Sequence, residues 1–343
     1  MSFWDELYNQ GNPVVGLSPM DGVTDAPMRY MTAKYGKPDV LLTEFVSVDG
    51  LHYATGERRE RLLKTFTRVR DVEGLHSRSV GSLHSWSVGA HPFKYPYEIA
   101  QVFGRTPDYF KEAAELIESM GFDGIDINMG CPAHKVEENG SGAGLIRTPE
   151  LAQEIVRAVK SATSLPVSVK TRIGVDHDVA EEWMTTLMEV EPANISLHGR
   201  TLRQLYQGSA DWEAIGRAAK VVHKYGGHIL GNGDIVDLQD GMGKVAQYGV
   251  DGFLIGRSAE GNPGIFAGMV EPSQEQRLAW MLEHTRVYEQ IFVERDDLSK
   301  SFMPMRKHLA WYCKGFPGAV EIRSKLMLTN NASEVERIVK EMI

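Results

Sequence analysis

The sequence predicts a (β/α)8 TIM barrel followed by an all-α helical domain. Eight short runs rich in β-branched residues recur between Val14 and Arg257, as is typical of buried parallel strands. Most of these runs are followed by an amphipathic helical pattern, and no strand pattern returns after Gly264. Eight strand–helix units in succession favour a closed barrel, because the alternative, a doubly wound sheet, rarely contains so many.

The predicted strands follow one another at similar intervals, with one exception. In chain order they are VVGLSPM from Val14, VLLTEFV from Val40, YEIAQVF from Tyr97, GIDINMG from Gly124, VSVKTRIG from Val167, NISLHGR from Asn194, GHILGNGD from Gly227 and GFLIGR from Gly252. The interval between the second and third runs is the longest. It contains a stretch at about 71–95 that is rich in Gly, Ser and His. We therefore expect an atypical loop there.

Two of the barrel helices carry start signals. Thr106 and Thr148 each precede a proline, and a threonine N-cap with proline in the first turn is a typical helix start. The buried face of the first helix should consist of Phe110, Ala113, Ala114, Ile117 and Met120. The pattern after Ser273 is helical, with a predicted break at 314–318, where the sequence reads KGFPG. The predicted domains are residues 1–268 for the barrel and 273–343 for the helices.

Composition sets limits on the class of protein. The chain has 343 residues, of which 42% are hydrophobic and 24% charged, as expected for an ordinary globular protein. Cys131 and Cys313 are the only cysteines, so no disulfide framework or four-cysteine metal site is possible. We expect no metal site and a cytoplasmic protein with reduced thiols. The acidic N-terminus is not a signal peptide, and no stretch is long and apolar enough to span a membrane.

The charge is unevenly distributed. The net charge is −9, which by itself argues weakly against a nucleic-acid partner. From Lys300 to Ile343, however, eight basic residues face four acidic ones, so that segment carries +4 and the remainder −13. Such a segment is either a solvated helical face or a surface for an anionic partner.

Barrel enzymes place their active sites at the carboxyl ends of the strands. In this sequence nearly every predicted strand ends in side chains or glycines that suit chemistry or ligand binding. They are Pro19, Met20, Glu44, Gln101, Asn128, Cys131, Lys170, Arg172, His198, Arg200, Asn232, Gly233, Asp234, Gly256 and Arg257. A purely structural barrel does not need this set, so we predict an active site.

Three of these features suggest particular chemistry. GNGDI and IGRSAEGNP place glycines after the last two strands, the usual phosphate site of the fold, where Arg257 can add a charged contact. Lys170 suits either a Schiff-base nucleophile or an electrostatic partner, for example of a reduced flavin. Cys131 suits a nucleophile or a proton donor, since an ordinary thiol pKa of about 8.5 leaves it mostly protonated at neutral pH.

Taken together, the motifs resemble one enzyme family. PMDGVTDAPMR, DGIDINMGCP, GSGAGLIRTPEL, VSVKTRIG, LHGRT with YQGSADW, GNGDI and IGRSAEGNP occur in this order. This series resembles the tRNA-dihydrouridine synthases over about residues 17–266. RKHLAWYCKGFPGA resembles the C-terminal helical domain of that family, most closely its bacterial B-type branch. His134 departs from the family pattern, which often has lysine there.

The resemblance implies an FMN-bound barrel that reduces the C5–C6 bond of a D-loop uridine in tRNA, with NADPH or NADH as reductant. It implies hydride transfer from flavin N5 to C6 and proton transfer from Cys131 to C5. The implied cofactor residues are Pro19, Met20, Gln101, Lys170, His198, Asn232, Gly233, Asp234, Gly256 and Arg257. The implied substrate residues are Asn128, Arg172, Arg200, Arg306 and Lys307. We also expect a monomer that has no protein partner and does not bind membranes.

Two other functions stay open at this stage. The first is an FMN barrel that oxidises or reduces a free pyrimidine, as a dihydroorotate- or dihydropyrimidine-type dehydrogenase does. Such an enzyme would not need the basic helical domain. The second is a tRNA-binding module without chemistry, for which Cys131, Lys170 and the phosphate site would have no purpose.

Overall fold

The computed structural model describes residues 2–72, 95–294 and 301–341. Apart from its two ends, the atypical loop predicted near 71–95 lies outside these residues. No helix in the described ranges is long and apolar enough to cross a membrane.

Eight parallel strands form a closed barrel in sequence order, which confirms the predicted fold. The strands are β1 (Val14–Leu17), β2 (Val40–Ser47), β3 (Tyr97–Phe103), β4 (Gly124–Met129), β5 (Val167–Arg172), β6 (Asn194–His198), β7 (Ile229–Asn232) and β8 (Gly252–Ile255). The barrel closes where β8 pairs with β1. Each strand begins within one of the predicted apolar runs, and only β2 extends past its run, by one residue, to Ser47. Runs buried on both faces carry a clear sequence signal.

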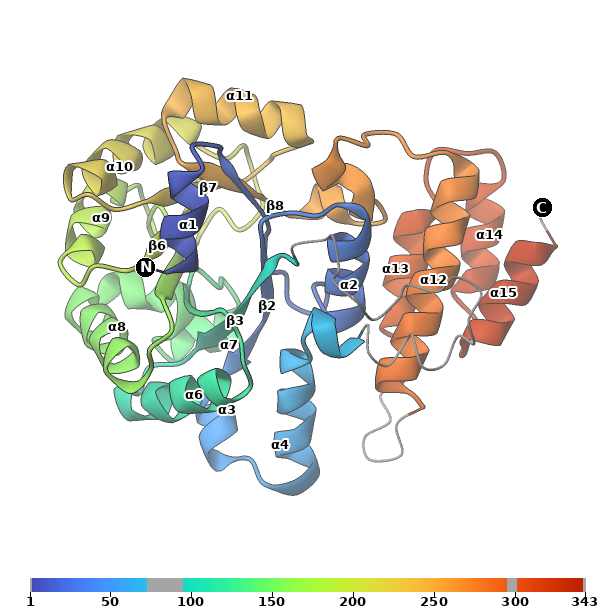
Figure 1. Ribbon diagram of the computed structural model, residues 1–343, viewed down its shortest axis with the longest axis horizontal. Helices are drawn as coiled ribbons and strands as arrows, with labels where there is room; N and C mark the ends of the chain where they lie inside the picture. Colours follow the sequence, from blue (N-terminus) through green and yellow to red (C-terminus); the bar gives the residue numbers. More distant parts are fainter. Residues whose placement is uncertain (1, 73–94, 295–300, 342–343) are drawn as a thin grey trace.

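Helices surround the barrel on its outside and at its ends (Figure 1). They are α1 (Phe3–Asn9), α2 (Ala26–Tyr35), α3 (Val48–Tyr53), α4 (Gly56–Leu63), α6 (Pro107–Ser119), α7 (His134–Glu138), α8 (Pro149–Ala162), α9 (Ala180–Met188), α10 (Trp212–Lys224) and α11 (Leu238–Tyr248). Short 3₁₀ turns are η1 (Lys64–Phe66), η2 (Gly142–Arg147), η3 (Arg257–Ala259) and η4 (Pro263–Ala267). The residues after β8 therefore form a three-residue turn and not an α-helix.

The two predicted helix starts are correct in position but not in capping chemistry. Thr106 and Thr148 occupy the N-cap positions of α6 and α8, yet neither side chain makes a capping hydrogen bond. The following prolines suit the first turn, because their fixed φ is already helical and they have no N–H to satisfy. By contrast, the Asp211 side chain caps α10 by accepting from the Ala214 N–H.

One end of the barrel is closed by apolar packing. Trp4 and Leu7 of α1 belong to the same buried cluster as Val14, Val40 and Ile99, near the starts of the first three strands. Because the strands are parallel, all their carboxyl ends lie at the opposite end. The amino-terminal end is thus a packed core, and chemistry is left to the other end.

Four helices beyond the barrel form a separate layer beside it, and Figure 1 shows them packed on the side of α2. They are α12 (Gln274–Phe292), α13 (Met305–Tyr312), α14 (Ala319–Leu326) and α15 (Ala332–Lys340). The predicted break at 314–318 separates α13 from α14. Glu283 of α12 anchors this layer to α2, accepting from Lys34 Nζ at 2.6 Å and from the Tyr35 hydroxyl at 2.5 Å.

Candidate active site

The strand register gathers the predicted site residues at the carboxyl end of the barrel. Asn128 on β4 lies opposite Lys170 on β5, and Arg172 lies opposite His198 on β6. His198 in turn lies opposite Asn232 on β7. These side chains come from four neighbouring strands at similar heights, as expected for the active site of a barrel enzyme.

A chain of hydrogen bonds runs from the barrel interior to the loop that carries Cys131. Asp126 accepts from Gln101 Nε2 at 2.7 Å, and Gln101 Oε1 accepts from Asn128 Nδ2 at 2.9 Å. Asn128 Oδ1 then accepts from the backbone N–H groups of Gly130 and Cys131, at 3.0 and 2.8 Å. Each amide is thus oriented by its neighbour, so the loop is held by the barrel core.

The Cys131 thiol lies in a confined position. The residue is 6% exposed. Gly142 of η2 has φ +57°, and a β-carbon there would lie 2.9 Å from the Cys131 carbonyl oxygen and 3.1 Å from Cys131 Cβ, so only glycine fits against it. Arg172 holds the other side of the loop by donating from Nε to the Gly130 carbonyl at 2.7 Å. Burial raises the pKa of the thiol above its ordinary value, so Cys131 is protonated at neutral pH.

Replacing Asn128 tests whether this hydrogen-bond chain positions the thiol. Asn128→Ala should lower turnover at least tenfold, and lower the free energy of unfolding by about 1–3 kcal/mol, because two loop N–H groups lose their acceptor. Asn128→Asp keeps an acceptor for both N–H groups and should retain more activity than the alanine variant. Turnover and chemical denaturation measure the two effects. Equal activity in wild type and Asn128→Ala would contradict the positioning role.

A buried lysine and a neutral histidine lie on β5 and β6, the two strands that follow β4 in the barrel. Lys170 Nζ donates to Asn232 Oδ1 at 3.1 Å, and Asn232 Nδ2 donates to the Leu254 carbonyl at 2.9 Å. Burial, assisted by Arg172, lowers the pKa of Lys170 to about 8. Burial and the nearby cations also lower the pKa of His198 far below its ordinary value, so the imidazole is neutral. The carboxyl end of the barrel therefore contains a lysine that titrates near neutral pH, Lys170, and a neutral imidazole, His198.

Asp234 connects the ends of β6 and β8. It accepts from Arg200 Nη2 at 2.6 Å and from Arg257 Nη2 at 3.0 Å. Burial alone would raise the pKa of Asp234, but hydrogen bonds from Arg200 and the Ala210 N–H hold it below its ordinary value. The Arg257 guanidinium lies 5.6 Å from the centre of the Tyr206 ring and is 57% exposed. Arg257 is thus a positioned but accessible cation at the predicted phosphate site.

Only glycine fits at position 233. Gly233 adopts φ +126°, a conformation that favours glycine, and a β-carbon there would lie 2.6 Å from Ala210 Cβ and 3.0 Å from His198 Cδ2. A β-carbon on Gly256 would lie 3.6 Å from Met20 Sδ, which places the loop after β1, with Pro19 and Met20, beside β8. The residues predicted to hold a phosphate and a ring therefore lie together.

Two of the predicted substrate residues, Arg172 and Arg200, form hydrogen bonds within the protein. Arg172 donates to the backbone carbonyls of Gly130, Thr201 and Leu205, while Arg200 donates to those of Gln207 and Gly208 as well as to Asp234. Both arginines thus support loops at the site. Their contact with a substrate stays a prediction.

The helical layer contributes one cation at the barrel rim. Lys307 Nζ would lie 3.1 Å from a β-carbon on Gly22, in the loop after β1. Its sequence neighbour Arg306 instead donates to the Thr329 carbonyl and to Asn330 Oδ1, both at 2.9 Å. Lys307 is therefore placed at the site, whereas Arg306 ties α13 to the segment before α15.

Sequence reasoning missed two residues of this site. Asp126 was not selected, although an acidic residue within an otherwise apolar strand is a visible signal. It is completely buried, and it also accepts from the Ser168 hydroxyl at 2.6 Å. Gly142 lies in a glycine-rich stretch that we used only as a motif, and its packing against Cys131 has no sequence signal.

His134, where the family often has lysine, is exposed and pairs with Glu138 at 3.0 Å.

Comparison with known proteins identifies the family. The dihydrouridine synthase (Dus) family model matches residues 16–343. The chain belongs to the dihydrouridine synthase family. It is 34% identical over 345 residues to a probable tRNA-dihydrouridine synthase of Staphylococcus aureus, covering 99% of this chain and 95% of the relative. It is also 34% identical to probable tRNA-dihydrouridine synthase 2 of Bacillus subtilis, covering 99% and 96%.

A solved structure agrees on the fold. A variant of NCR from Zymomonas mobilis superposes with a TM-score of 0.50 at 14% identity, over 78% of this chain and 90% of the other. At this identity the likeness concerns the barrel alone. Membership of the dihydrouridine synthase family confirms the resemblance inferred from the motifs and the expected enzyme class, an oxidoreductase.

Proposed function

We propose that this chain is an FMN-dependent, NADPH-driven tRNA-dihydrouridine synthase that reduces the C5–C6 bond of a D-loop uridine. The observation that carries the proposal is the position of Cys131 at the carboxyl end of the barrel, where Asn128 accepts from its backbone N–H and Gly142 packs against its Cβ. A protonated, positioned thiol suits a general acid. Full-length similarity to proteins named as tRNA-dihydrouridine synthases supports the substrate.

The residues present fit FMN. An anionic phosphate needs a cation, and Arg257 offers an exposed guanidinium that follows Gly256 and bonds to Asp234 next to Gly233. A flavin ring takes up negative charge when it is reduced, and Lys170 provides a buried cation for that edge. We assign Asn232 and Asp234 to the phosphate side, and Pro19, Met20, Gln101 and His198 to the ring. When bound and reduced by NADPH, FMN supplies the hydride for C6 of the uracil.

Arg257→Ala should weaken retention of FMN. The substitution removes an accessible cation whose orientation is set by Asp234, and a charge-assisted hydrogen bond contributes about 1.5–3 kcal/mol. We therefore expect flavin affinity to fall by roughly tenfold to a hundredfold. Absorbance of bound flavin after gel filtration measures the change. Unchanged flavin content would remove Arg257 from the phosphate site.

In this proposal the chain's own residues handle the proton and the orientation of the base. Hydride at C6 leaves negative charge at C5, which must be quenched by a proton on carbon. The Cys131 Sγ–H supplies that proton, and burial keeps the thiol protonated until it is needed. The Gly130 and Cys131 N–H groups donate to Asn128, which fixes the backbone that carries the thiol.

The uridine has to leave its RNA stack to reach this end of the barrel, so the tRNA must be held from outside. We assign that grip to the helical domain, residues 273–343, beside the catalytic barrel, residues 1–268. Lys307 supports this assignment, because it lies at the loop after β1. Burial raises the pKa of Glu260, which follows β8, while the charges of Lys314, Arg257 and Lys307 oppose the shift. We propose that the enzyme works on tRNA as a monomer in the cytoplasm.

Charge reversal at Lys307 tests the tRNA grip. Lys307→Glu should weaken tRNA binding and lower the slope of log affinity against log salt by about 1, because one phosphate contact is lost. Lys224→Glu is the matched control, since Lys224 is exposed in the last turn of α10, away from the strand carboxyl ends. Equal affinity of wild type and Lys307→Glu at every salt concentration would show that tRNA docks elsewhere.

A further inference from the structure

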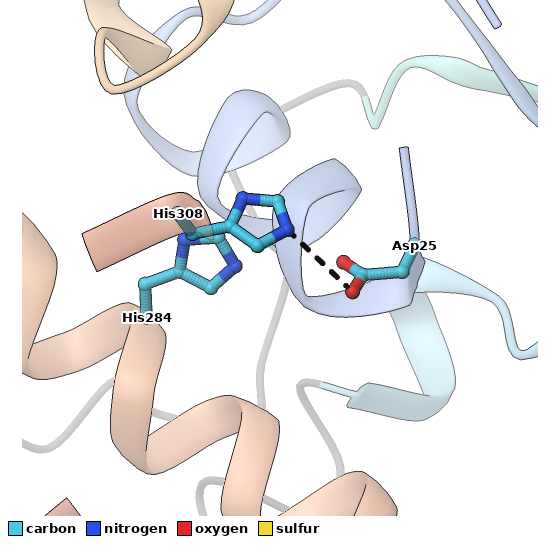
Figure 2. A group of neighbouring side chains, drawn as sticks. All are labelled: Asp25, His284 and His308. Carbon is cyan, nitrogen blue, oxygen red and sulfur yellow. Dashed lines mark ion pairs between the residues drawn. The ribbon is translucent and has the colours of Figure 1, made fainter. Parts of the chain in front are cut away.

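Three buried polar side chains meet where the helical layer packs on the barrel. Asp25 is the N-cap of α2, His284 lies on α12 and His308 lies on α13. They are 5%, 1% and 2% exposed, and one ligand atom from each lies within 4.8 Å of the others. Figure 2 shows both imidazoles and the carboxylate turned toward a common point. In the described part of the chain, no other group of three His, Cys, Asp or Glu residues meets this distance.

The two imidazoles have nitrogens that no described residue satisfies. His284 Nδ1 lies 3.1 Å from the Tyr312 hydroxyl, but His284 Nε2 is buried without a hydrogen-bond partner. His308 Nε2 is also buried without one, and its distance of 3.9 Å from Asp25 Oδ2 is too long for a hydrogen bond. A buried polar atom without a partner costs about 1–3 kcal/mol. Two such atoms directed at one point indicate a missing ligand.

The third member of the group is the Asp25 carboxylate, whose two oxygens have different surroundings. Asp25 Oδ1 accepts from the Met28 N–H at 2.9 Å as the cap of α2, while Oδ2 is the atom directed toward His308.

We propose that Asp25, His284 and His308 bind a divalent transition metal, with zinc as the ion that fits best. Two imidazole nitrogens and one carboxylate oxygen are usual zinc ligands, and water can complete four-coordination. If the Nδ1–H of His284 donates to the Tyr312 hydroxyl, its Nε2 lone pair is left for the metal, the usual outer support of a histidine ligand. Ligand atoms of a tetrahedral zinc site lie about 3.3 Å apart, so His308 and Asp25 need to approach by only about half an ångström.

Such a metal would connect the helical layer to the barrel. Its ligands belong to α2 on one side and to α12 and α13 on the other. Lys307, which reaches the loop after β1, precedes His308 directly. The metal would therefore fix the position of α13 at the barrel rim. It is separate from Cys131 and Lys170, so its existence does not depend on the proposed reaction.

Metal binding by the tag-free full-length chain tests this site. After removal of metals with a chelator, equilibrium dialysis against Zn²⁺ or Co²⁺ should give one ion per chain. Bound Co²⁺ should show visible absorption typical of a four-coordinate site, and Zn²⁺ should abolish it. Asp25→Asn, His284→Gln and His308→Gln should each weaken binding at least a hundredfold. His223→Gln is the matched control, because this exposed histidine also pairs with a carboxylate, Asp251, at 2.9 Å.

Asp25→Asn keeps the test valid if the histidine variants fail to fold, because asparagine still caps α2. At a free Zn²⁺ concentration of 100 times Kd, the unfolding equilibrium of wild type should shift about a hundredfold toward the folded state. The melting temperature of Asp25→Asn should not respond to zinc. A wild-type chain that binds no zinc at micromolar free metal would overturn the proposal. Zinc binding that Asp25→Asn retains would also overturn it. The same holds for zinc binding that is lost only in His223→Gln.

Discussion

Cys131→Ala is expected to retain FMN and lose turnover by about 10²–10⁴-fold, the usual contribution of a positioned general acid. The side chain is buried beside Gly142, and its thiol stays protonated because burial raises its pKa. Removing it leaves C5 of the uracil without a proton source. The same burial predicts a pH effect with a definite sign, because the acid form exists below the thiol pKa. Turnover should fall as pH rises through that raised value.

Single-turnover assays with tRNA, together with flavin absorbance, separate the two parts of this prediction. Cys313→Ala is the matched control, because Cys313 is also buried but lies at the end of α13, in the helical layer. A Cys131→Ala variant with full activity would eliminate the acid assignment. A variant that also loses its flavin would show that Cys131 has a structural role in the cofactor site.

Replacing Lys170 should have the second large effect. Lys170→Met removes the buried amine that donates to Asn232, and loss of a preorganised charge partner typically costs about 10²–10³ in rate. We expect slower reduction of bound flavin by NADPH and a lower flavin midpoint potential. Stopped-flow absorbance and redox titration measure these quantities. A Lys170→Met enzyme with wild-type reduction rate and potential would show that the amine does not face the flavin.

The pKa of Lys170 gives this prediction a pH signature. Burial, together with Arg172, lowers that pKa to about 8, so the ammonium form is lost as pH rises through 8. Flavin reduction in wild type should therefore slow between about pH 7 and pH 9. In Lys170→Arg the charge persists, because a guanidinium is protonated throughout this range. The fall near pH 8 should be absent from that variant. A fall of equal size in both enzymes would assign the titration to another group.

The barrel could be predicted because its signals are local. Each strand is a short apolar run. A parallel strand that is buried on both faces reads as continuously apolar, without the alternation of a half-exposed strand. Residues such as Lys170 and His198 could be selected for the same reason, since parallel strands bring all their carboxyl ends together. The capping failure at Thr106 shows the limit of such signals. A residue type at the right position does not fix the rotamer that would make the bond.

The hydrogen-bond chain to Cys131 could not be predicted, because it depends on register between strands. Gln101 reaches Asp126 only because these residues are directly paired across β3 and β4. Arg306 and Lys307 show a related limit, since adjacent side chains on a helix point in directions about 100° apart. Lys307 therefore reaches the barrel rim, whereas Arg306 reaches the loop before α15.

The metal site proposed at Asp25, His284 and His308 differs from the expectation of no metal site, which rests on the small number of cysteines. Asp25 is 259 residues from His284 in the sequence, and the two meet only because α12 packs on α2. A single histidine within an apolar helix carries no signal for such a meeting. Rules based on sequence spacing cannot detect ligands that come together only when separate layers of the fold pack against each other.

Mass spectrometry of tRNA nucleosides tests the central claim most directly. The purified chain, FMN and NADPH would be incubated with tRNA from a strain that lacks dihydrouridine synthases, with Cys131→Ala as the matched control. Our account predicts that one or more uridines gain two hydrogens with wild type and not with the variant, and fragment mapping would then locate them. Bound flavin and NADPH oxidation without any gain in tRNA would contradict it and favour a free pyrimidine as substrate.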